Sequence, residues 1–169
     1  MSALLNLGFR PFFLGAGVFA VVSMTAWLAI YVAWYQPAMQ GIGASQWHAH
    51  EMIYGYTTAV IAGFLLTAIR NWTGIPTLAR APLAALVACW AVARLALLAG
   101  TAFIALAAVA DLLFAALLIP ACAVPIVRAR QWRQMAVLSK LVLLGIGNAL
   151  FYAGVFGMLD EGVRWSLYG

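Results

Sequence analysis

The sequence predicts an all-α, polytopic membrane protein with about five transmembrane helices and a cytoplasmic N-terminus. Of its 169 residues, 67% are hydrophobic and 8% are charged, and the mean hydropathy is +1.03. A soluble domain carries about 25% charged residues, so this chain cannot cover a water-facing surface. Apolar stretches of about 20 residues, each long enough to cross a bilayer, occupy nearly the whole chain. Residues 1–169 are therefore expected to form a single transmembrane domain whose main partner is the lipid bilayer.

The first two spans are expected at about 12–34 and 48–69. The first contains no charged residue and ends in a cluster of Tyr and Trp, which is typical of a membrane–water interface. The second begins within the sequence WHAHEM and ends just before Arg70. Glycine and proline residues follow and break the helix.

The last three spans are expected at about 83–98, 102–124 and 137–159. A short turn at Gly100 separates the first two of these, which predicts a tight antiparallel hairpin. A basic segment at 128–134 leads into the last span.

The positive charges predict the orientation in the membrane. Arginines precede the first span and lie in the loops between the second and third spans and between the fourth and fifth. The intervening loops carry no Lys or Arg, so the positive-inside rule places the N-terminus in the cytoplasm. The same loops account for the net charge of +5, and no nucleic-acid partner is predicted.

The WHAHEM segment at 47–52 is the strongest candidate for a cofactor site. It holds both histidines of the chain, His48 and His50, together with Glu51 and Met52. These side chains are ligand types for haem iron or copper. The alternative is that each histidine only bonds to a loop carbonyl or a lipid headgroup.

Helical spacing refines this prediction. In a regular helix His48, Glu51 and Met52 share one face with Gly55, and a strip of small residues continues that face. Either a porphyrin or a neighbouring helix could lie against such a strip. His50 points the other way, so one metal could bind both histidines only if the helix is irregular there.

Arg94 lies inside the third predicted span and Asp111 inside the fourth. Across the Gly100 turn they differ in depth by about four residues, roughly 6 Å. One interpretation is an ion pair that fixes the hairpin. The other is that Arg94 holds a haem propionate or a substrate anion, or that Asp111 relays protons.

Four motifs together resemble the NnrS family, with matching order and spacing: FRPFF at 9–13, WHAHEM at 47–52, AGFLLTA at 62–68 and NWTG at 71–74. Arg94 and Asp111 also look like family positions. The resemblance implies a multi-pass protein of the bacterial inner membrane that contains haem and copper. It further implies a role in the nitric-oxide response and in relief of nitrosative stress around denitrification.

The resemblance also implies residue roles. His48 and His50 would be the metal ligands, Met52 and Arg94 would contact the cofactor, and Glu51 would orient a ligand or move protons. Family members are usually longer, so this chain would correspond to the first part of the family architecture. A haem that needs two axial histidines would then require a homo-oligomer or a further membrane subunit.

Two other function classes remain open, and the residues do not decide whether the chain is an enzyme. A redox subunit could transfer electrons from quinol or to nitric oxide, although haem–copper enzymes need histidines from several helices. A non-enzymatic transporter or assembly subunit is the other alternative.

Overall fold

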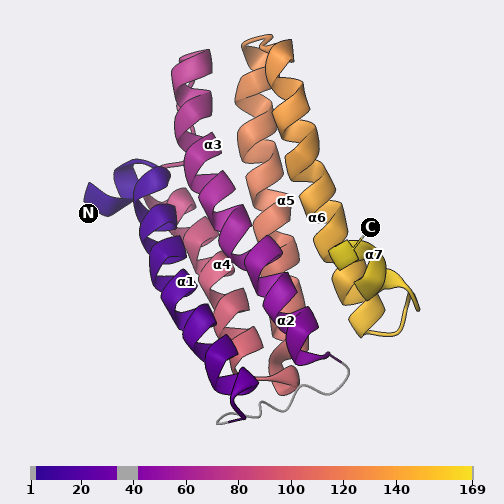
Figure 1. Cartoon of the computed structure of the whole chain (residues 1–169). Helices are drawn as coiled ribbons and strands as arrows, with labels where there is room; N and C mark the ends of the chain where they lie inside the picture. The colour runs from indigo at the N-terminus through magenta and orange to yellow at the C-terminus, as the bar shows by residue number, and fades with distance from the viewer. Residues whose placement is uncertain (1–2, 34–41, 169) are drawn as a thin grey trace.

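The computed structural model describes residues 3–33 and 42–168, and these are mostly helical with no strand among them. Five helical segments are long and apolar enough to cross a membrane, which confirms the predicted fold class (Figure 1). They are Phe9–Tyr31, Ala44–Thr73, Arg80–Leu98, Thr101–Arg128 and Trp132–Val155. The predicted end of the first span, at residue 34, lies outside the described residues.

The elements follow one another as an antiparallel bundle (Figure 1). The main helices are α1 (Phe9–Tyr31), α2 (Ala44–His50), α3 (Thr58–Thr73), α4 (Arg80–Leu98), α5 (Ile104–Arg128), α6 (Met135–Val155) and α7 (Gly162–Tyr168). Three short 3-10 turns accompany them: η1 (Ala3–Asn6), η3 (Thr101–Phe103) and η4 (Trp132–Gln134).

The second span is not a regular α-helix. Between α2 and α3 the chain forms a π-helix, η2 (Glu51–Thr57). The Thr57 hydroxyl donates to the Met52 carbonyl oxygen, five residues earlier, at 2.8 Å. A π-helix changes which side chains share a face and is frequent at functional sites. This irregular stretch begins at Glu51 and so includes the last two residues of the WHAHEM segment.

The predicted hairpin of the third and fourth spans is confirmed. Gly100 has a φ of 101°, a conformation that glycine adopts without strain, and it joins α4 to η3 and α5. Helix α5 continues through Pro120 and Pro125 to Arg128, so the predicted end near residue 124 is four residues short. Prolines are tolerated in membrane helices because neighbouring groups satisfy the freed backbone atoms.

Helix α1 covers the strip of small residues on α3. Ala59 and Ala62 are fully buried, and a Cβ built on Gly63 would lie 2.9 Å from the ring of Phe13. Of the two alternatives for this strip, the structure therefore shows a neighbouring helix rather than space for a porphyrin.

The C-terminal tail folds back as α7, a helix that the sequence analysis did not predict. It packs against the end of α6 (Figure 1). A Cβ on Gly154 of α6 would lie 2.5 Å from the backbone nitrogen of Val163, so the absence of a side chain permits this contact. The Tyr54 hydroxyl donates to the Ser166 carbonyl oxygen at 2.7 Å and ties α7 to the π-helix.

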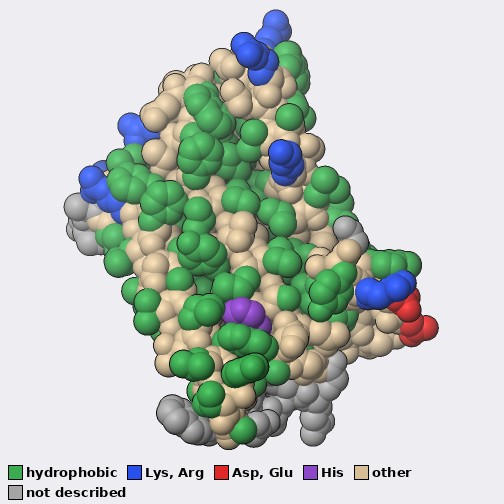
Figure 2. Space-filling view, viewed as in Figure 1, with side chains coloured by type: hydrophobic (Ala, Val, Ile, Leu, Met, Phe, Trp, Pro, Cys, Tyr) green, Lys and Arg blue, Asp and Glu red, His purple; other side chains and the backbone are tan. Residues whose placement is uncertain are grey.

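Charges lie mainly at the two ends of the bundle. Lys and Arg side chains are prominent toward the end where α3 terminates and α6 begins, and the acidic side chains visible on this face lie beside α7 (Figure 2). The basic end is the one that carries the arginine-containing loops from which the orientation was predicted. The direction of insertion stays a prediction.

Candidate functional site

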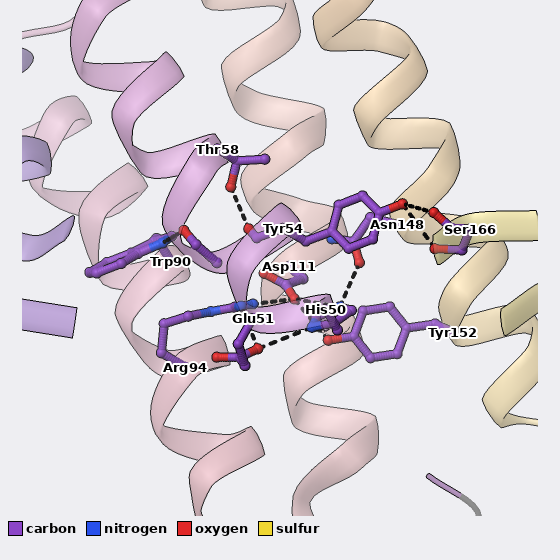
Figure 3. Close-up of polar contacts among 11 residues, drawn as sticks. His50, Glu51, Tyr54, Thr58, Trp90, Arg94, Asp111, Asn148, Tyr152 and Ser166 are labelled. Atoms are coloured by element: carbon purple, nitrogen blue, oxygen red, sulfur yellow. Dashed lines mark hydrogen bonds and ion pairs between the residues drawn. The ribbon is translucent and has the colours of Figure 1, made fainter. Parts of the chain in front are cut away.

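A cluster of polar side chains is buried where α2, η2, α4, α5 and α6 meet (Figure 3). No member is more than 5% exposed. We refer to it as the buried polar cluster: His50, Glu51, Arg94, Asp111, Asn148 and Tyr152. Ionisable groups inside a membrane protein are costly unless they are paired, so each must be accounted for by its partners.

Arg94 of α4 lies between the two carboxylates. Its Nη1 donates to Glu51 Oε1 at 2.7 Å, and its Nη2 donates to Asp111 Oδ2. The ion-pair interpretation of Arg94 and Asp111 is therefore the one that the structure shows. Glu51 joins the same guanidinium, so one cation links three membrane-spanning segments.

His50 contacts the same oxygen of Glu51 that Arg94 contacts. Its Nδ1 is 3.0 Å from Glu51 Oε1, and its Nε2 is 3.0 Å from Asn148 Oδ1 on α6. The ring also packs against Phe151, with centroids 4.1 Å apart. Both ring nitrogens thus have polar partners inside a closed environment, and neither is open to a metal in this arrangement. Asn148 makes the interhelical hydrogen bond expected for such a residue in a membrane helix.

Tyr152 completes the buried polar cluster. Its hydroxyl donates to Asp111 Oδ2 at 2.8 Å. This carboxylate oxygen therefore receives hydrogen bonds from both α4 and α6. The sequence analysis missed Tyr152, because a tyrosine within an apolar span is also an ordinary core residue.

Some buried atoms of the cluster have no hydrogen-bond partner. They are Glu51 Oε2, Arg94 Nε and Asp111 Oδ1. A nearby cavity of about 20 Å³ is lined by Tyr54, Thr58 and Asn148 together with apolar residues of α5 and α6. Its volume is sufficient for one water molecule. The cluster thus has capacity for further hydrogen bonds.

His48 lies apart from this cluster. Its ring stacks on Trp27 of α1, with centroids 4.5 Å apart and an interplanar angle of 15°. The side chain is half-buried, and its Nδ1 is buried without a hydrogen-bond partner. The two histidines therefore contact different helices, α1 for His48 and α6 for His50.

The structure brings together four of the six predicted site residues: His50, Glu51, Arg94 and Asp111. His48 and the half-buried Met52 lie outside the cluster. Among the described residues, no group of three or more His, Cys, Asp and Glu side chains could hold a metal ion. The carboxylates of Glu51 and Asp111 are instead held by Arg94.

Comparison with known families identifies the chain. A family model described as "NnrS protein" matches residues 3–169. The chain belongs to the NnrS family. Searches of curated proteins and of solved structures found no match. At the level of the family, NnrS membership supports a role in the nitric-oxide response.

Proposed function

We propose that this NnrS protein binds haem and acts in resistance to nitrosative stress, with His48 as the haem ligand that this chain supplies. The observation that supports the proposal is the half-buried ring of His48, which lies outside the buried polar cluster and is held by stacking on Trp27. A neutral imidazole nitrogen is a common axial ligand of haem iron. When bound, the haem supplies an iron centre able to take nitric oxide.

His50 fits this role less well, because both of its ring nitrogens already lie within hydrogen-bond distance of Glu51 and Asn148. Arg94 is also a poor candidate for contacting a haem propionate. Its guanidinium contacts two carboxylates, and a haem propionate would add a third negative charge to the same buried place. We therefore propose no propionate contact for Arg94.

Copper stays a proposal that rests on the family. Imidazole and thioether groups suit copper. The predicted metal ligand His48 and the predicted cofactor contact Met52 both lie outside the buried polar cluster. Two donors do not complete a copper site, so the others would come from a second copy of the chain or a further membrane subunit. The proposed location is the bacterial inner membrane, with the N-terminus in the cytoplasm.

The test is an optical spectrum of the purified protein, oxidised and reduced, with haem extraction and copper analysis on the same sample. We expect a Soret band that His48→Ala abolishes while the protein remains monodisperse. In His50→Ala, any protein that remains folded should keep the band. A folded, colourless wild-type protein, or a band unaffected by His48→Ala, would contradict the proposal.

A further inference from the structure

We propose that the beginning of α6 binds the headgroup phosphate of an anionic phospholipid between Arg133 and Lys140. Figure 1 places this part of α6 at the opposite end of the bundle from α2, the helix that carries His48. The site is therefore independent of haem binding. It is inferred from the position of Lys140, from the charges of the chain and from the geometry of the helix.

Lys140 is a cation inside a membrane-spanning segment. This segment is Trp132–Val155, and Lys140 lies eight residues from its start, roughly 12 Å along the helix at 1.5 Å per residue. The side chain is exposed, so it faces the lipid and not the interior of the bundle. A charged residue at such a position is costly and points to a function that involves a partner.

The chain supplies no counter-ion for Lys140. Only four of its residues are acidic. Glu51 and Asp111 are enclosed in the buried polar cluster, whereas Asp160 and Glu161 follow the far end of α6. Within residues 3–33 and 42–168, no ion pair includes Lys140. The negative charge that balances this lysine is therefore expected from outside the chain.

A second copy of the chain does not solve this problem. Copies inserted in the same orientation hold the same residues at the same depth, and Asp160 lies twenty residues beyond Lys140, roughly 30 Å along the helix. Two copies that met through this face would bring two lysines together. Anionic phospholipid headgroups, in contrast, attract basic residues at the membrane surface.

Helix geometry directs Lys140 toward such a headgroup. Each Cα–Cβ bond of a helix tilts toward the N-terminus, so the side chain of Lys140 extends back toward the beginning of α6. Its methylene groups can lie along apolar surface while the amine reaches the interface. Trp132, which is 60% exposed, is typical of a residue at that interface.

Arg133 supplies the second cation. It lies seven residues before Lys140, which is two helical turns, and therefore on about the same side of the helix. Arg133 is also exposed, and among the described residues it forms no ion pair. Both side chains thus have donors available for phosphate oxygens, unlike Arg94, whose guanidinium already contacts two carboxylates.

Apolar surface next to Lys140 favours a lipid over a soluble anion. Leu143, one turn farther along α6, is 65% exposed, and Ile146 is 51% exposed. These side chains lie deeper in the same membrane-spanning segment, where the acyl chains of a bound phospholipid would contact them. A soluble phosphate compound would make no such contact.

The test is native mass spectrometry of the purified full-length protein in detergent. Phosphatidylglycerol and phosphatidylethanolamine with identical acyl chains are titrated separately, and the dissociation constant of the first bound lipid is measured. We expect tighter binding of phosphatidylglycerol. Lys140→Gln and Arg133→Gln should each weaken it about fivefold, the loss expected for one basic residue near a membrane surface, and leave phosphatidylethanolamine binding unchanged.

Arg80→Gln is the matched control. Arg80 is an exposed arginine at the start of α4, at the same end of the bundle, so this substitution removes the same charge from a different helix. It should weaken phosphatidylglycerol binding less than about twofold, and Lys140→Arg should retain the wild-type affinity. Soluble glycerol 1-phosphate should not displace the lipid.

Four outcomes would overturn the proposal. Equal affinities of the wild-type protein for the two lipids would show no selection for negative charge. An equal loss in Arg80→Gln would mean general attraction to the basic end of the bundle. Unchanged binding in both folded α6 variants would show that the lipid binds elsewhere, and displacement by glycerol 1-phosphate would show a site for soluble anions.

Discussion

The Nη1 atom of Arg94 lies directly over Gly55, where a Cβ on that glycine would stand 2.5 Å away. The guanidinium can reach Glu51 and Asp111 only because the π-helix presents bare backbone at this point. The Gly55 carbonyl oxygen also accepts a hydrogen bond from the indole of Trp90 at 2.8 Å. The arginine and the glycine thus form one structural unit.

Gly55→Ala is expected to destabilise the fold by about 1–3 kcal/mol, because an added methyl group overpacks against Arg94 and Phe19. The measurement is reversible unfolding in mixed detergent micelles. Gly17→Ala is the matched control, since a Cβ there meets nothing within 4 Å. Similar losses in both variants would contradict the close approach of Arg94.

Arg94→Met should cost about 3–5 kcal/mol, because it leaves the carboxylates of Glu51 and Asp111 buried without their cation. The control is Arg164→Met, which removes an exposed ion pair with Glu161 and should cost no more than about 1 kcal/mol. Unfolding of the two variants under identical conditions gives the comparison. A mild effect of Arg94→Met would show that the cluster contributes little to stability.

The two histidines are expected to differ in their effect on stability. His50→Ala removes a partner of Glu51 and of Asn148 and should cost about 1–3 kcal/mol. His48→Ala should change the unfolding free energy much less, because the half-buried ring of His48 mainly stacks on Trp27. Equal effects of the two substitutions would mean that His50 is not engaged as described.

Tyr54→Phe is expected to loosen α7, because it removes the hydroxyl that donates to the Ser166 carbonyl oxygen. Loss of this bond should cost about 1 kcal/mol locally, which hydrogen–deuterium exchange over 162–168 detects as faster exchange. Tyr56→Phe is the control, since Tyr56 lies on the same π-helix with an exposed side chain. Unaltered exchange in Tyr54→Phe would contradict this attachment.

The predicted orientation can be tested by cysteine labelling. In a background of Cys89→Ala and Cys122→Ala, we introduce Gln131→Cys in the basic loop and Asp160→Cys before α7. An impermeant maleimide added outside inner-membrane spheroplasts should label the second position only. Labelling of position 131 without permeabilisation would reverse the topology.

The ion pair of Arg94 and Asp111 was within reach of sequence reasoning, because a short turn fixes the relative depth of two adjacent helices. Sequence reasoning could not predict that Glu51 and His50 belong to the same cluster. The directions in which side chains point change where the helix becomes the π-helix η2. Hydrophobic periodicity read at 3.6 residues per turn does not reveal a π-helix. Tyr152 joins from α6, a contact across 41 residues that no local pattern encodes.

The sequence by itself determined the membrane environment, the five spans and the hairpin, since hydropathy, charge and turn residues act locally along the chain. The tertiary structure decided which histidine is enclosed and which keeps an unpartnered ring nitrogen. It also decided that the tail returns to α6 as α7. These outcomes depend on side chains from distant segments meeting in a low-dielectric interior, where a buried polar group must find a partner.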